Sequence, residues 1–313
     1  MLRFIPDDTK INFMKSRMIA IIFSVALMVG SLALFWTEGL NLGIDFKGGS
    51  SIEIGASHPI DVALVRSTLS GLNLGEIKVQ EHGTPNSAMI RIERQLGDEG
   101  VQAEAVSAVL AALKEVMPEV IPPRSTSSIG PTVSGELAVD GTKAIVLAVI
   151  AVMIYIWLRF EWQFGLGAVL ALTHDVVLTI GFFAITRLEF NLSIIAALLT
   201  IVGYSLNDTV VVYDRVRENI RKFSKRGVED VINLSLNQTL SRTITTSLTT
   251  LLALFALYFI GGQAVSGFTA AMIWGVVVGT YSSVFIASPM LLFFKVKRSD
   301  LVHDEDDSSK EKA

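Results

Sequence analysis

The sequence contains no cysteine, and charged residues make up only 18% of its 313 residues. The absence of cysteine excludes disulfide bonds, cysteine zinc sites and thiolate-held clusters. Soluble domains carry about 25% charged residues, so this low charge content argues against an ordinary soluble globule. The formal net charge of −4 also argues against nucleic-acid binding, because nucleic-acid-binding proteins present basic patches.

Long apolar runs dominate the chain. Hydrophobic residues make up 51% of the sequence, and the mean hydropathy is +0.53. A helix needs about 20 mostly apolar residues to cross a bilayer. We expect six such spans, at residues 18–36, 144–158, 164–186, 192–212, 240–260 and 268–294. The first run is longer than the core of a cleavable signal peptide and ends in aromatic residues, so we interpret it as an uncleaved anchor.

Lysine and arginine predict the orientation of the spans, because they concentrate in cytoplasmic loops. If all six runs cross, one side of the membrane carries most of the basic residues near the span ends: Lys15, Arg17, Arg159, Arg215, Arg217, Arg221, Lys222, Lys225, Arg226, Lys295, Lys297 and Arg298. Both termini are therefore predicted to be cytoplasmic. The predicted parts are a cytoplasmic N-terminus (1–17), span one (18–36), an exported domain (37–141), spans two to six with a cytoplasmic loop at about 214–238 (142–295), and a cytoplasmic acidic tail (296–313).

The interval between the first two spans has the pattern of a small α+β domain. Residues 60–72 and 99–116 show the apolar spacing of amphipathic helices. Alternating or short extended runs predict strands at 48–54, 77–81, 88–94 and 124–129. The resulting order β-α-β-β-α-β suggests a ferredoxin-like fold.

No pattern of catalytic residues is present in the sequence. Nucleotide-binding loops, the HExxH zinc motif and the Gly-x-Ser-x-Gly nucleophile motif are all missing. His58 and His82 are isolated, and we interpret them as solvated loop residues. We therefore expect no enzymatic activity, no cofactor and no metal site.

The most informative residues are ionisable groups inside the spans. A charge near the bilayer centre costs about 2.5–3.5 kcal/mol and usually marks an ion path. Asn207 precedes one such charge, Asp208. Thr246 lies four residues after another, Arg242, and therefore on the same helical face. With the hydroxyl-rich run 239–250, they form a polar seam between helices. The candidate ion-coupling residues are His174, Asp175, Asn207, Asp208, Arg242 and Thr246.

Each of these charges also has a structural interpretation. His174 and Asp175 fit a helix–helix hydrogen bond. Arg242 is close enough to its span end to reach the cytoplasmic interface. Asp208 fits a position near the cytoplasmic end of its span, or a permanent ion pair with Arg242. A permanent pair, however, leaves the hydroxyl-rich seam unexplained.

Several motifs, taken in order, resemble the SecD/SecF family of the resistance-nodulation-division superfamily. Lys47 is a small departure, since threonine is more usual there. The resemblance runs from about residue 18 to 295, and its motifs are GIDFKGG at 43–49, IGP at 129–131, GEL at 135–137, RFEW at 159–162, THD at 173–175, GYSLNDTVVVYDR at 203–215, RT at 242–243, TTS at 245–247 and GTYSS at 279–283.

The resemblance implies a bacterial inner-membrane protein that assists protein export by drawing on a proton or sodium gradient. It implies a SecD partner, with the two chains together forming a twelve-helix transporter. The other partners that it implies are the Sec translocon (SecY, SecE and SecG), a translocating unfolded polypeptide and the lipid bilayer. It assigns Asp208 and Arg242 to the ion-coupling centre.

Two alternatives remain at the sequence level. One is half of a small-molecule exporter of the same superfamily, although such exporters usually carry a larger exported domain than about 100 residues. The other is a passive scaffold for the translocon that moves no ion.

Overall fold

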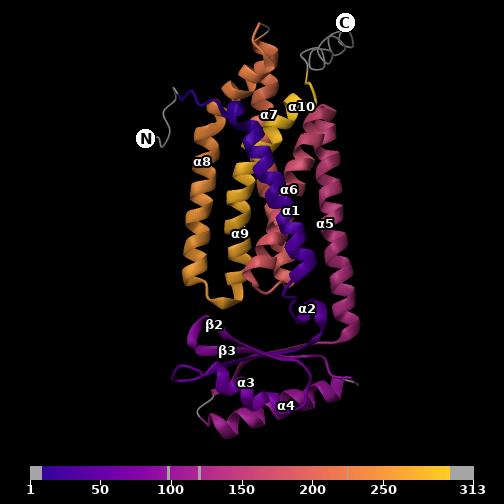
Figure 1. The fold of residues 1–313 in the computed structure, drawn as a ribbon, viewed down its shortest axis with the longest axis vertical. Helices are drawn as coiled ribbons and strands as arrows, with labels where there is room; N and C mark the ends of the chain where they lie inside the picture. The colour runs from indigo at the N-terminus through magenta and orange to yellow at the C-terminus, as the bar shows by residue number, and fades with distance from the viewer. Residues whose placement is uncertain (1–8, 97–98, 119–120, 224, 297–313) are drawn as a thin grey trace, which may run out of the picture.

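A computed structural model describes residues 9–96, 99–118, 121–223 and 225–296 of the chain. Long helices stand side by side, with a small α+β domain at one end of the bundle (Figure 1). Six helical segments are long and apolar enough to cross a membrane, which confirms the six predicted spans. They are Phe13–Glu38, Val133–Arg159, Trp162–Thr186, Leu192–Lys222, Val228–Ile260 and Val265–Phe293.

Three of the membrane helices form the interior of the bundle and three lie outside. In the most apolar stretches of α6, α7 and α9, 56%, 50% and 61% of residues are buried, against 6%, 6% and 11% for α1, α5 and α8. A turn of 3-10 helix, η1 (Phe13–Ser16), precedes α1, and a π-helical turn, η2 (Ser283–Ala287), leads from α9 to α10 (Ser288–Phe293). The membrane helices are α1 (Arg17–Glu38), α5 (Pro131–Arg159), α6 (Trp162–Thr186), α7 (Leu192–Lys222), α8 (Val228–Ile260) and α9 (Gln263–Ser282).

Helices α7 and α8 extend far beyond the predicted spans. Most of the interval 214–238, which we predicted as a loop, is helical, because α7 ends only at Lys222 and α8 begins at Val228. Val216 and Ile220 pack in one buried cluster with Ile232. Hydropathy identifies only the most apolar stretch of a helix, whereas apolar residues repeated along one face let the two helices continue and pack together beyond that stretch.

The α+β domain has the predicted order β-α-β-β-α-β. Its four strands form one antiparallel sheet in the order β2-β3-β1-β4, which is the arrangement of a ferredoxin-like fold. Helices α3 and α4 cover the face of the sheet that points away from the membrane helices (Figure 1). The elements are β1 (Gly49–Gly55), α3 (Val62–Ser70), β2 (Ile77–His82), β3 (Thr84–Ile92), α4 (Glu99–Val116) and β4 (Ile121–Ile129).

The α+β domain requires glycine where the chain enters β1, and it ends earlier than we predicted, at the start of α5. Gly49 has φ +109°, and a Cβ there would lie only 2.4 Å from the backbone oxygen of Ile92. Only glycine fits where the chain enters β1. At the other end, α5 begins at Pro131, so residues 131–141 of the predicted domain are already helical. Helix α5 therefore begins before the apolar run 144–158 that we predicted as the second span.

A polar latch joins the α+β domain to the membrane bundle. Arg91 on β3 forms an ion pair with Glu189 in the loop between α6 and α7. Asn41, after α1, donates its side-chain N–H to the Arg187 carbonyl at 2.8 Å. Asp45 in the short helix α2 (Ile44–Lys47) accepts the first backbone N–H of α7 at 2.7 Å. The sheet is therefore tied directly to the start of α7.

Candidate functional site

Asp208 lies on the inward side of α7 and is 3% exposed. Its Oδ2 atom is buried and has no hydrogen-bond partner among the described residues. Arg242 on α8 exerts a Coulombic attraction on this carboxyl, and Thr246 is the polar group that lies beside it. No ion pair joins Asp208 to Arg242 in the part of the chain that the structure describes. The carboxylate is thus near a cation without being paired to it.

The α8 side of the site is rich in hydroxyls. The Thr246 hydroxyl donates to the Thr243 carbonyl at 2.9 Å. The Thr243 Oγ1 atom is buried and has no hydrogen-bond partner among the described residues. Ser247, one position beyond Thr246, shares a 2.7 Å hydrogen bond with Thr280 on α9. These groups place a polar path through an otherwise apolar layer.

Much of this polar seam is open to the outside of the bundle. Asn207 is exposed beside the buried Asp208, and Arg242 is exposed on α8. Exposed polar side chains are costly in hydrocarbon, so they normally face protein or water. The other exposed positions of the seam are Thr200, Gly203, Thr245 and Thr249.

His174 and Asp175 form a second, fully enclosed polar cluster. Both side chains are 1% exposed, and His174 Nδ1 lies 2.9 Å from Asp175 Oδ1. Ser205 on α7 and Ser282 on α9 donate to Asp175 Oδ2 at 2.6 and 2.8 Å. Asp175 therefore connects three helices and has partners on both oxygens.

The predicted site residues fall into two groups. Asp208, Arg242 and Thr246 come together, with Asn207 on the exposed side of the same helix. His174 and Asp175 lie in the enclosed cluster, and no hydrogen bond joins them to Asp208 among the described residues. Ser205 and Ser282 were not predicted as site residues, because their contact with Asp175 depends on how α7 and α9 pack against α6. The pair Gly275 and Gly279 was the available signal, because small residues at this spacing allow close helix packing.

The arrangement around Asp208 suits reversible ion binding. A buried carboxylate with one oxygen that lacks a hydrogen-bond partner is suited to binding a cation or a proton, since burial disfavours its free charge. Approach of the Arg242 guanidinium favours the charged carboxylate again. Two positions of α8 relative to α7 would therefore give the site two affinities for a small cation.

Comparison with known proteins decides the family. The SecD/SecF GG motif matches residues 33–60, and the family described as "Protein export membrane protein SecD/SecF, C-terminal" matches residues 106–297. The chain belongs to the SecD/SecF family. The glycine pair Gly48-Gly49 and the segment around Asp208 both lie within the matched residues.

Individual relatives agree with the family assignment. The chain is 46% identical to "Protein translocase subunit SecF" of Cereibacter sphaeroides over 95% of this chain and 93% of that protein. It is 48% identical to the protein of the same name from Magnetococcus marinus, over 91% and 92% of the two chains. Among solved structures, SecDF of Thermus thermophilus superposes with a TM-score of 0.83 and 32% identity, over 93% of this chain. The chain spans 40% of the length of that SecDF protein.

Proposed function

We propose that this chain is a gradient-driven subunit of a protein-export complex, in which Asp208 carries the coupling ion and Arg242 controls its release. The single observation that carries the proposal is the state of Asp208, which is buried and lies near a cation that is not paired with it. Its relatives are named as protein translocase subunits. The role is non-enzymatic, since the work would come from ion movement and not from bond chemistry.

The energy available from one ion is sufficient for a conformational step. One elementary charge crossing 100 mV gains about 2.3 kcal/mol, and two states of a flexible protein differ by a few kcal/mol. The latch from Arg91 to Glu189 leads from the sheet to the start of α7, which carries Asp208. Ion binding at Asp208 would therefore bias the position of the α+β domain and hinder backward sliding of a translocating polypeptide.

The partner that this site needs is a second set of membrane helices. The exposed polar side chains on α7 and α8, among them Asn207 and Arg242, require a protein or water-filled surface opposite them. The SecDF structure similar to this chain is much longer than the chain itself. We propose that SecD supplies this surface, and that the pair acts beside the SecY, SecE and SecG translocon in the bacterial inner membrane.

The proposed orientation places both termini in the cytoplasm. The start of α1 and the end of α10 lie at the end of the bundle opposite to the α+β domain (Figure 1). Basic residues concentrate at that same end, including Arg159, Arg217 and Lys222. The α+β domain would then lie in the periplasm.

The alternative of a small-molecule exporter has less support, because the relatives that match most of the chain are named as protein translocase subunits.

An experiment distinguishes the gradient-driven subunit from the alternative of a passive scaffold. Vesicles containing the translocon, SecD and this chain should export a substrate faster when an ion gradient is imposed. A protonophore and a sodium ionophore, tested separately, should show which gradient matters. Stimulation that survives both ionophores would favour the scaffold, and full stimulation without SecD would contradict the shared site.

A further inference from the structure

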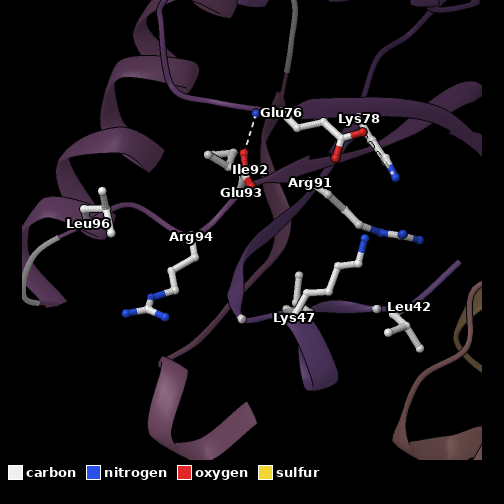
Figure 2. Close-up of a pocket in the computed structure, with 12 residues that line it drawn as sticks. Leu42, Lys47, Glu76, Lys78, Arg91, Ile92, Glu93, Arg94 and Leu96 are labelled. Atoms are coloured by element: carbon white, nitrogen blue, oxygen red, sulfur yellow. Dashed lines mark hydrogen bonds and ion pairs between the residues drawn. The ribbon is translucent and has the colours of Figure 1, made fainter. Parts of the chain in front are cut away.

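A pocket of about 440 Å³ lies where the α+β domain meets the short helix α2. Its volume is within the range of sites that hold small ligands. Figure 2 shows Lys47 extending toward Arg91, with Lys78 on the same side and Arg94 on the opposite side. Leu42 and Leu96 also line the pocket.

The pocket has an excess of positive charge. Its four cationic side chains face two carboxylates, Glu76 and Glu93. Glu93 is engaged by the backbone N–H of Glu76 at 2.8 Å, and the Glu76 carboxylate lies 3.4 Å from Lys78. Arg91 is paired with Glu189, and the other two cations, Lys47 and Arg94, are exposed.

Lys47 and Arg94 have no carboxylate partner among the described residues. The charge of Arg91 is compensated by its ion pair with Glu189, and Lys47 extends toward this pair (Figure 2). An anion in the pocket would supply the counter-charge that Lys47 and Arg94 lack. The cations come from α2, β2, β3 and the segment after β3, so the fold itself gathers them.

The pocket lies close to the end of the first membrane helix. α1 ends at Glu38, only four positions before the pocket residue Leu42. Trp36, in the last turn of α1, is 82% exposed, as expected for an aromatic residue at a membrane–water interface. Leu96 on the pocket rim is 90% exposed, which is an unfavourable position for leucine in water. The start of α5 lies next to the pocket as well. A Cβ added to the pocket residue Gly48 would lie 3.7 Å from Arg94 Cδ and 3.4 Å from Ser134 Oγ of α5.

We propose that this pocket binds the headgroup of an anionic phospholipid, which Lys47 and Arg94 attract from the two sides of the pocket. Arginine and lysine at a membrane surface are suited to phosphate oxygens. The exposed side chain of Leu96 and the half-buried side chain of Leu42 would border the glycerol and upper acyl carbons. A lipid held there contacts α2, β3 and the start of α5 together, and so fixes the α+β domain against the bilayer.

The test compares lipid binding by matched variants of the full chain. The delipidated protein in detergent is titrated with phosphatidylglycerol, and binding is measured by native mass spectrometry. The double variant Lys47→Gln/Arg94→Gln should bind about thirtyfold more weakly, from the loss of two cations at an anionic surface. The control Lys114→Gln/Lys143→Gln removes two exposed cations outside the pocket and should bind like the wild type. Equal affinity in both double variants, or an equal loss in both, would overturn the proposal.

Two further arms identify the source of the anion. Phosphatidylcholine should bind the wild type weakly and should not distinguish it from the Lys47→Gln/Arg94→Gln variant. Inorganic phosphate should displace phosphatidylglycerol only at concentrations far above that of the lipid. Displacement at equal concentrations would mean that the pocket binds a free anion, and the lipid assignment would be wrong. Asp208→Asn should bind phosphatidylglycerol like the wild type, so this result is independent of the ion-coupling proposal.

Discussion

Two buried carboxylates in neighbouring helices have opposite environments. Asp175 receives hydrogen bonds from Ser205 and Ser282 and lies beside His174. Asp208 has one oxygen without any partner among the described residues. Burying a carboxylate without partners is unfavourable, whereas full hydrogen bonding offsets much of that cost. We therefore expect the Asp175 carboxylate to stabilise the fold and the Asp208 carboxylate to lower its stability.

This difference predicts opposite effects of the same substitution on stability. Asp175→Asn should lower the free energy of unfolding by about 1.5–3 kcal/mol, because it weakens hydrogen bonds to a charged acceptor. Asp208→Asn should leave stability unchanged or raise it. Thermal unfolding of the purified chain in detergent, followed by circular dichroism, measures both. Equal destabilisation by the two variants would contradict the distinction.

At the residue scale, the sequence was sufficient to find the charges but not their partners. Asp208, Arg242, His174 and Asp175 stand out because charge is costly in a bilayer. Their division into two groups depends on the rotation of α6, α7 and α8 about their axes, which hydropathy does not determine. The structural interpretation of Asp175, which the sequence left open, is the one that its hydrogen bonds favour.

At the scale of helices, α7 and α9 approach each other closely through glycine. A Cβ on Gly275 would lie 2.3 Å from Ile201 Cγ1, and one on Gly279 would lie 3.0 Å from Ser205 Cβ. Ser205, which lies against Gly279, and Ser282, at the end of α9, both donate to Asp175. Helix packing and the enclosed polar cluster therefore depend on the same two glycines.

The packing of α9 predicts a strong difference between two glycine substitutions. Gly275→Ala should destabilise the chain by about 1–3 kcal/mol, as overpacking does. Gly203→Ala is the matched control, since nothing lies within 4 Å of a Cβ there, and alanine should add up to about 1 kcal/mol of helix stability. Denaturant or thermal unfolding of the chain alone distinguishes them. A neutral Gly275→Ala would show that the helices are less tightly packed than described.

The latch between β3 and the α6–α7 loop predicts a charge-swap rescue. Arg91→Glu or Glu189→Arg alone should place like charges together and loosen the junction. The double variant Arg91→Glu/Glu189→Arg should restore it. Amide hydrogen exchange of residues 187–192 should rise in both single variants and return toward the wild-type rate in the double variant. Unchanged exchange in the single variants would show that the ion pair does not hold the domain.

Most elements could be predicted from the sequence, and their lengths could not. The alternating and helical patterns between the first two spans were enough to predict the ferredoxin-like order. The extensions of α7 to Lys222 and of α8 from Val228 were missed because charged residues such as Arg215 and Glu229 hide a helical pattern from a hydropathy criterion. The latch was missed because Arg91 and Glu189 are almost one hundred positions apart.

At the scale of the whole molecule, the proposed topology predicts opposite labelling of two sites. The chain has no cysteine, so single cysteines report without background. Ser107→Cys on α4 and Lys225→Cys between α7 and α8 are both exposed positions. In inner-membrane vesicles and intact spheroplasts, a membrane-impermeant maleimide should reach Ser107→Cys from the periplasm and Lys225→Cys from the cytoplasm. Labelling of both from the same side would contradict the assignment.

The whole account depends on ion binding at Asp208, so the most direct measurement is gradient-dependent export with this one group altered. Vesicles containing the translocon, SecD and either wild type or Asp208→Asn are given the same ion gradient, and the rate of substrate export is compared. Asparagine keeps the shape of the side chain and removes its titration. We predict that Asp208→Asn folds and assembles with SecD but loses the gradient-dependent part of export. Full gradient-dependent export by Asp208→Asn would contradict the account.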